Sequence, residues 1–262
     1  MPDAVENETL VHVFRHTAQA ARFVSHLWLA LSRKALFGQA TFTVALSGGK
    51  TPSVLYDTLS RSKGAFPWSR THLFLVDERF VPSDDPESIA GLIRKHLLDP
   101  LSLPGENLHA VPTEGVSLEE AARHYEDALR TFFGARCMVP CFDLVMLGIG
   151  RDGHTASLFP DAAGLEEGRR LAIPVRTGHS PHERITLTFT VINSASNVVF
   201  FVTGRDKAAI MRQVLDKKGD AMLPAARVRP LNKRLLYVLD EGAASRLDRH
   251  SLRDHVAIVV HP

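Results

Sequence analysis

The chain has 262 residues, of which 45% are hydrophobic and 23% are charged, which is typical of a globular protein. Its 31 basic and 29 acidic residues give a formal net charge of +2 without a long run of one sign, which argues against a dedicated nucleic-acid binder. The first residues contain acids and lack the apolar core of a signal peptide, and no stretch reaches the length of a membrane span. We therefore expect a cytoplasmic protein with no nucleic-acid partner and no membrane partner.

Apolar runs and helical patterns alternate along the chain. In the first half we expect strands at 10–14, 41–46 and 73–76, with helices at 17–37 (ended by Gly38), 52–59 (Thr51 as N-cap), 87–97 and 118–133. In the second half we expect a strand from 142, strands at 185–189, 198–202 and 235–239, and a helix at 206–215. Such alternation predicts a single α/β domain over 1–262, a Rossmann-like layered fold whose mainly parallel central sheet is flanked by helices.

Two further features bear on organisation. The segment 160–182 carries Pro and Gly without a clear period, and we expect it to be a loop on the active-site side. Cys137 and Cys141 lack the partners of a zinc site, so we expect reduced, structural thiols and no metal centre.

The segment 142–160 is the most informative in the chain. An apolar run leads into a turn containing Gly148, Gly150 and Gly153, with Asp152 and His154 two residues apart. Ligands of open α/β sheets bind outside the carboxyl ends of such strands, and histidine is the side chain best suited to proton transfer near neutral pH. His154 is therefore a candidate catalytic residue, although a histidine that only packs the turn remains the alternative.

The turn Ser47-Gly48-Gly49-Lys50-Thr51 joins a strand to a helix. Its glycines allow a ligand close to the backbone, and the start of a helix offers unpaired N–H groups, so we interpret it as a phosphate cradle. It is not a Walker A loop, because Val44 stands where the first glycine belongs. A nucleophile elbow at Ser47 would need glycine at Ala45, and a plain tight turn is the remaining alternative.

Basic residues near other strand ends would suit a phosphorylated ligand. Arg79 follows the strand at 73–76, Arg184 precedes the strand at 185–189, and Lys207 follows the strand at 198–202. The planar arginine fork matches phosphate oxygens, although each charge could also be an ordinary solvated one. Gly148 to Gly153 also reads G-x-G-x-x-G, but the next apolar run ends at Arg176 instead of an acid, so a dinucleotide site is a weak alternative.

Taken together, these segments resemble the 6-phosphogluconolactonases. The resemblance covers nearly the whole chain and rests on a set of motifs in the family's order: Ser47-Gly48-Gly49-Lys50-Thr51-Pro52, Asp77-Glu78-Arg79, Gly153-His154-Thr155-Ala156-Ser157-Leu158-Phe159-Pro160, Arg184-Ile185-Thr186-Leu187-Thr188 and Val202-Thr203-Gly204 with Lys207.

The resemblance implies hydrolysis of 6-phospho-D-glucono-1,5-lactone to 6-phospho-D-gluconate, the second step of the oxidative pentose phosphate pathway. It implies His154 as the general base that activates water and Asp152 as the residue that orients it. The phosphate would be held by Ser47, Gly48, Gly49, Lys50 and Thr51 together with Arg79, Arg184 and Lys207. Ester hydrolysis moves no electrons, so no cofactor and no metal are expected.

Two other functions remain open on the same fold. The related glucosamine-6-phosphate deaminases continue their Gly-His pair as I-A-F-N-E-P and use that Glu, whereas this chain continues as Thr155-Ala156-Ser157-Leu158-Phe159-Pro160 and lacks the acid. A sugar-phosphate isomerase or deaminase is therefore one alternative, and a non-enzymatic regulator that binds a sugar phosphate is the other. The chain also departs from the lactonases at Ile89, where asparagine is usual.

Overall fold

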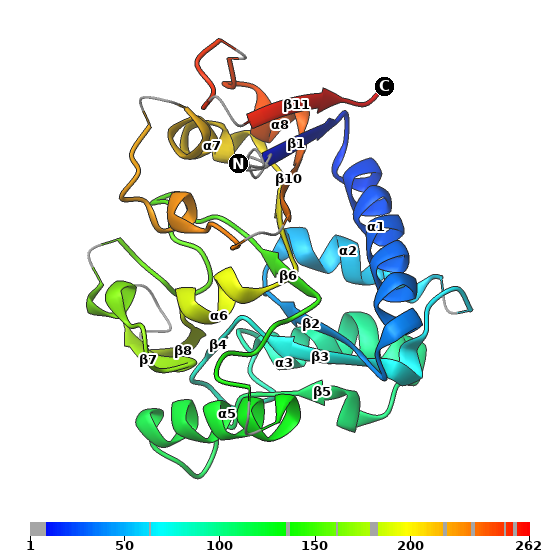
Figure 1. Cartoon of the computed structure of the whole chain (residues 1–262), viewed down its shortest axis with the longest axis vertical. Helices are drawn as coiled ribbons and strands as arrows, with labels where there is room; N and C mark the ends of the chain where they lie inside the picture. The colour runs from blue at the N-terminus through cyan, green and yellow to red at the C-terminus, as the bar shows by residue number, and fades with distance from the viewer. Residues whose placement is uncertain are drawn as a thin grey trace, which may run out of the picture.

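A computed structural model describes residues 9–262 except 63, 135–136, 161, 179–182, 217–218, 232–233, 249 and 254–255. Within that part of the chain, a central parallel sheet of eight strands is flanked by helices, and a small antiparallel sheet of three strands lies beside it (Figure 1). This arrangement confirms the α/β class and the mainly parallel sheet predicted from the alternating pattern. No described helix combines the length and the apolar composition that crossing a bilayer requires.

The central sheet runs in the order β11-β1-β10-β9-β6-β2-β3-β5, and all its pairings are parallel. Its interior strands are nearly continuous apolar runs, as expected for strands covered on both faces. In chain order the strands are β1 (Thr9–Phe14), β2 (Phe42–Leu46), β3 (Thr71–Leu75), β5 (Leu108–His109), β6 (Leu144–Leu147), β9 (Asn197–Val202), β10 (Arg234–Asp240) and β11 (Val256–Val260).

The helices that connect these strands differ widely in length. The α-helices are α1 (Thr17–Gly38), α2 (Lys50–Ser60), α3 (Ile89–Ile93), α4 (Asp99–Leu101), α5 (Leu118–Phe133), α6 (Phe189–Ser194), α7 (Ala208–Leu215) and α8 (Glu241–Ala244). A π-helical segment, η2 (Arg94–Leu98), follows α3. Short 3-10 helices are η1 (Trp68–Arg70), η3 (Gly105–Asn107), η4 (Ala163–Glu166), η5 (Arg205–Lys207) and η6 (Pro224–Arg227).

The small sheet corrects two sequence-based expectations. The charged segment that follows the strand expected at 73–76 is itself strand β4 (Asp77–Arg79), which pairs antiparallel with β8 (Glu183–Leu187). The segment expected as a loop at 160–182 contains η4 and strand β7 (Ala172–Arg176), which pairs with the other side of β8. Of that loop, residues 161 and 179–182 lie outside the described part of the chain. Backbone hydrogen bonds to a neighbouring strand thus order segments that carry no periodic pattern of their own.

Helix boundaries differ from expectation where local chemistry decides them. α2 begins at Lys50 instead of Pro52, because Gly49 rather than Thr51 is the N-cap, with φ +113°. Such a φ strains any residue with a side chain, so glycine sets this boundary. The helix expected at 87–97 begins at Ile89, where the Ser88 side chain accepts the N–H of Gly91, and turns π-helical after Ile93. The strand expected at 185–189 ends at Leu187.

The parallel sheet grows in both directions from β2. The chain builds β2, β3 and β5 toward one edge, and then returns to place β6 on the other side of β2, followed by β9 and β10. This reversal of strand order is a topological switch point, and it leaves a crevice outside the carboxyl ends of the two strands. The turns that follow β2 and β6 are the two glycine-rich segments singled out in the sequence.

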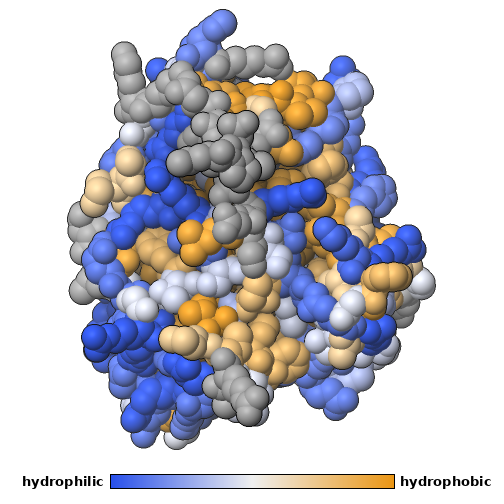
Figure 2. All heavy atoms as spheres, viewed as in Figure 1, coloured by the Kyte–Doolittle hydropathy of each residue, from blue (hydrophilic) through white to orange (hydrophobic). Residues whose placement is uncertain are grey.

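A pair of histidines joins each edge strand of the central sheet to its neighbour. At one edge Nδ1 of His72 and Nε2 of His109 share a hydrogen bond of 3.0 Å, and the His109 ring stacks on Phe74. At the other edge, His12 and His261 share a hydrogen bond of 2.8 Å. At that edge an apolar surface patch lies over β11, at the top of Figure 1 and Figure 2. Burial, together with the charge of the partner His72, lowers the pKa of His109 to about 4, and burial lowers the pKa of His72 as well.

We expect acid to destabilise the fold through these histidines. The unfolded chain takes up their protons near pH 6.5 and the folded chain only at lower pH, so stability is lost as the pH falls from 6.5 toward 4. His109→Phe keeps a ring on Phe74 but cannot take a proton, and it should reduce the drop in Tm between about pH 7 and about pH 5. His124 is exposed, so His124→Ala serves as the control. An equal drop in Tm in the wild type, in His109→Phe and in His124→Ala would contradict the role assigned to His109.

Candidate active site

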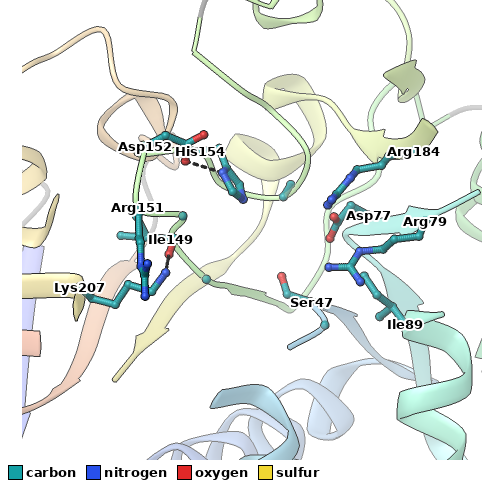
Figure 3. A pocket seen from close by; sticks show the side chains of 14 residues that line it. Ser47, Asp77, Arg79, Ile89, Ile149, Arg151, Asp152, His154, Arg184 and Lys207 are labelled. Atoms are coloured by element: carbon teal, nitrogen blue, oxygen red, sulfur yellow. Dashed lines mark hydrogen bonds and ion pairs between the residues drawn. The ribbon is translucent and has the colours of Figure 1, made fainter. Parts of the chain in front are cut away.

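A cavity of about 440 Å³ opens at the switch point, outside the carboxyl ends of β2 and β6 (Figure 3). Its size lies within the range of small-molecule sites. It brings together residues from five parts of the chain that are far apart in sequence. The lining consists of Ser47, Gly48, Asp77, Arg79, Ile89, Gly148, Ile149, Gly150, Arg151, Asp152, His154, Ala156, Arg184 and Lys207.

Most of the site residues predicted from the sequence meet in this cavity. Those that line it are Ser47, Gly48, Arg79, Asp152, His154, Arg184 and Lys207. Gly49, Lys50 and Thr51 belong to the same turn but do not line the cavity, and the Thr51 hydroxyl lies 2.8 Å from that of Thr203. In the described part of the chain, no three His, Cys, Asp or Glu side chains gather in a way that could hold a metal ion.

Ser47 ties the ends of the two central strands together. It is buried, and its hydroxyl donates to the backbone carbonyl of Met146 on β6 at 2.8 Å. The buried Tyr56 of α2 donates in turn to the Ser47 carbonyl at 2.6 Å. Both bonds fix the turn to its neighbours, so the Ser47 hydroxyl serves as a structural donor at the floor of the cavity.

His154 and Asp152 form a close pair above this floor. Oδ1 of Asp152 lies 2.6 Å from Nδ1 of His154 and also accepts the His154 backbone N–H at 3.2 Å. A carboxylate on Nδ1 holds the neutral imidazole in the tautomer whose Nδ1 carries the proton, which leaves the basic lone pair on Nε2. The loop can adopt this shape because Gly150 has no side chain: a Cβ there would overlap the His154 ring and the Asp152 carboxylate.

The surroundings tune both members of the pair. Burial lowers the pKa of His154 below its ordinary value of 6.5, although the charge of Asp152 opposes the change. Burial alone would raise the pKa of Asp152, but the charge and hydrogen bonds of His154 outweigh it and hold that pKa below the ordinary value. At neutral pH the site therefore contains a neutral imidazole beside an ionised carboxylate, which is the protonation state of a general base.

Two arginines face each other on one wall of the cavity (Figure 3). Arg79 and Arg184 are directly opposite in the antiparallel pairing of β4 with β8, an arrangement that is normally destabilising for like charges. Burial and the charge of Arg79 lower the pKa of Arg184, while nearby Asp77 and Glu87 oppose that effect. Nη1 of Arg79 donates to Glu87, but its buried Nε has no partner. Such a cluster is suited to an anionic group of a ligand.

Lys207 lies on the opposite wall, beside Arg151 (Figure 3). Its ammonium donates to the backbone carbonyl of Ile149 at 2.8 Å. Burial lowers the pKa of Lys207, an effect that the charge of Asp206 opposes. The cavity thus has cations on two sides, with His154 between them.

Sequence reasoning missed Asp77, although an acid directly after a buried strand could have indicated it. The Asp77 carboxylate is buried, accepts the Ser157 hydroxyl at 2.7 Å and lies beside Arg184 in Figure 3. Its neighbour Glu78 faces away from the cavity and accepts the backbone N–H groups of Arg79, Ile89 and Ala90 at 2.8 Å each. Burial raises the pKa of Glu78 in spite of these bonds. This carboxyl fixes the start of α3, which supplies Ile89 to the wall.

Gly150→Ala should displace the His154 ring, because the new methyl group would occupy the space of the ring and of Asp152. We expect the proton NMR signal of the His154 Nδ1–H to be lost or strongly shifted while the protein stays folded. Gly148→Ala is the matched control, since a Cβ at Gly148 meets nothing within 4 Å. If the signal were unchanged in Gly150→Ala, the role assigned to Gly150 would be wrong.

Comparisons with known proteins agree with this geometry. A family model described as glucosamine-6-phosphate isomerases/6-phosphogluconolactonase matches residues 15–237. The 6-phosphogluconolactonase of Nostoc sp. is 39% identical over 232 residues, which cover 87% of this chain and 95% of that protein. The human 6-phosphogluconolactonase is 37% identical over 251 residues, covering 92% and 96%.

A solved structure supports the same conclusion. The crystal structure of 6-phosphogluconolactonase from Thermotoga maritima superposes with a TM-score of 0.77 at 31% identity, covering 89% of this chain and all of that one. The family match begins directly after β1 and ends within β10, and so includes every segment that lines the cavity. On this evidence the chain belongs to the glucosamine-6-phosphate isomerase/6-phosphogluconolactonase family.

Proposed function

We propose that this protein hydrolyses 6-phospho-D-glucono-1,5-lactone to 6-phospho-D-gluconate. The observation that carries the proposal is the His154–Asp152 pair, a neutral imidazole oriented by a carboxylate in a cavity with cations on two sides. The names of the relatives point to the same reaction. The substrate has a permanent anion at its phosphate and develops a second one at its lactone carbonyl, so cations on both walls suit it.

His154 is the general base in this mechanism. Its Nε2 takes a proton from a water molecule as the water oxygen attacks C1 of the lactone, and the carbonyl oxygen becomes an oxyanion. Backbone N–H groups of the glycine turns or an arginine stabilise that oxyanion. The intermediate collapses by breaking the bond between C1 and the ring oxygen, which receives the proton from the imidazolium and leaves as the C5 hydroxyl. Asp152 stabilises the imidazolium and keeps the ring oriented.

The substrate phosphate is held by the cations and by the turn at the start of α2. Arg79, Arg184 and Lys207 line the cavity, as do Ser47 and Gly48. Gly49, Lys50 and Thr51 complete the turn, and the helix that begins there directs the positive end of its dipole toward an anion at Gly48.

Phe159 favours a lactonase over a deaminase or isomerase. Its ring centroid lies 4.5 Å from that of His154, and the Arg184 guanidinium lies over it at 5.6 Å. The related deaminases carry their catalytic Glu in this stretch after the Gly-His pair, whereas here an apolar ring packs beside the histidine. A regulator that only binds sugar phosphates would have no need for a buried base paired with a carboxylate.

His154→Asn should lower kcat by about 10²- to 10⁴-fold while 6-phosphogluconate still binds, because only the general base is removed. Rates are measured above the spontaneous opening of the lactone. For the wild type, kcat should fall only below pH 6.5, since burial lowers the pKa of His154. Asp152→Asn removes the charge that stabilises the imidazolium, so its acid limb should move to lower pH and its kcat should fall. A His154→Asn variant with the wild-type rate would refute the mechanism.

Arg184→Ala and Lys207→Ala should each raise KM by about tenfold or more, because charge-assisted contacts to phosphate contribute roughly 1.5–3 kcal/mol and 1.4 kcal/mol is tenfold. Unphosphorylated gluconolactone should be a much poorer substrate of the wild type. Comparing kcat/KM for the two lactones tests this in each variant, since both variants should lose part of the wild-type preference for the phosphorylated lactone. If the wild type used both lactones equally well, no phosphate site would operate.

A further inference from the structure

A second cavity, of about 400 Å³, lies between α1 and α2, which pack against each other. Figure 1 shows the C-terminal end of α2 directed toward α1. The cavity shares no residue with the active-site cavity: Gly48 of that cavity precedes α2, whose 11 residues span about 16 Å, and Arg61 of this one follows the helix. Its lining consists of Ala18, Arg22, Ser25, His26, Leu29, Thr58, Arg61, Ser62, Ala65 and Phe66.

Three basic side chains surround the mouth of this cavity. Arg22 and His26 are one helical turn apart on α1, and Arg61 is the first residue after α2. All three are exposed, and across the described ranges of the chain none of them forms an ion pair with a carboxylate, whereas Arg79 and Arg151 of the active-site cavity are each paired. Converging cations without a carboxylate partner indicate an anion as the missing partner.

The Ser25 hydroxyl adds a donor to the same cavity. Ser25 is only 4% exposed, lines the cavity and has no hydrogen-bond partner among the described residues. The equally buried Ser32 on the same helix donates to the carbonyl of Leu29 at 2.9 Å, so the helix itself can satisfy a serine. The hydroxyl of Thr58 is similarly bound to the carbonyl of Val54. The protein therefore leaves the Ser25 hydroxyl available as a donor to a ligand in this cavity.

The remaining walls are apolar. Leu29 and the buried Phe66, together with Ala18 and Ala65, provide a hydrophobic surface beside the basic groups. An inorganic ion would leave this surface in contact with water, whereas a molecule with a carbon skeleton would cover it. The volume is large enough for a ligand the size of a small phosphorylated metabolite.

We infer that the α1–α2 cavity is a second ligand site that binds a small organic phosphate ester. Its phosphate lies between Arg22, His26 and Arg61, where two arginine forks match phosphate oxygens. The Ser25 hydroxyl donates to it, and the carbon skeleton packs on Leu29 and Phe66. The inference concerns a surface remote from the active site and does not depend on the reaction proposed there.

A site-resolved NMR titration with glycerol 3-phosphate tests this inference at constant ionic strength. We expect the amide signals of Ser25 and Arg61 to shift and saturate below about 10 mM, the range of a weak specific site. Inorganic phosphate should bind at least threefold more weakly, because it cannot use the apolar wall. Signals of Gly150 and His154 report separately on any binding in the active-site cavity.

Variants separate the site from a general effect of anions. Arg61→Ala should weaken binding at this cavity by about tenfold or more and leave the active-site signals unchanged. Arg33, an exposed arginine of α1, does not line the cavity, so Arg33→Ala is the control and should bind as the wild type does. Ser25→Ala should weaken binding without lowering Tm, since its hydroxyl has no partner to lose.

Three results would overturn the inference. The first is the absence of saturable shifts at Ser25 and Arg61 with glycerol 3-phosphate. The second is equal weakening by Arg61→Ala and Arg33→Ala, which would mean that only general charge matters. The third is equal affinity for inorganic phosphate and for the ester, which would show that the apolar wall has no role and that the site takes an adventitious ion only.

Discussion

The parallel pairing of β2 with β6 is the constraint on which the site depends. These strands are about a hundred residues apart in sequence, and their pairing places two glycine-rich turns at the same edge of the sheet. The bond from the Ser47 hydroxyl to the Met146 carbonyl joins the two strand ends directly. Without this pairing, the turn that begins α2 and the loop that carries His154 would not face a common cavity.

The wall of the cavity brings charged side chains close together. The small sheet places Arg79 opposite Arg184, and the buried Asp77 beside Arg184 accepts the hydroxyl of Ser157. Like charges across a ladder cost stability, and sites that a fold maintains in spite of such a cost are typically functional. The burial that lowers the pKa of His154 also strengthens the attraction between the nearby cations and a bound anion, because charges interact more strongly where the dielectric constant is low. The presence of the neutral base at neutral pH and the affinity for anions thus have the same physical cause.

The sequence alone predicts the parallel sheet and both turns, because buried strands and glycines leave strong local signals. It does not predict the small sheet: Asp77-Glu78-Arg79 is short and charged, so only its pairing with β8 makes it a strand. It also does not predict that the cations lie on two walls of the cavity, because that arrangement depends on pairing between strands far apart in the sequence. β11 was missed although its run of valine and isoleucine resembles a strand. Buried Asp77 was missed because a charged residue after a strand is usually solvated.

Ile89 shows how this chain accommodates its departure from the lactonase pattern. Its backbone N–H donates to Glu78, so the position of the residue in the wall is set by the main chain and not by its side chain. A Cβ on Gly48 would lie 2.5 Å from Cγ1 of Ile89, so the branched side chain fills the space that this glycine leaves open. The presence of isoleucine instead of the usual asparagine at position 89 therefore leaves the backbone position unchanged and places an apolar surface where a polar side chain would stand. That surface lies next to Arg79, and an apolar neighbour lowers the local dielectric, which strengthens the attraction of the arginine for an anion.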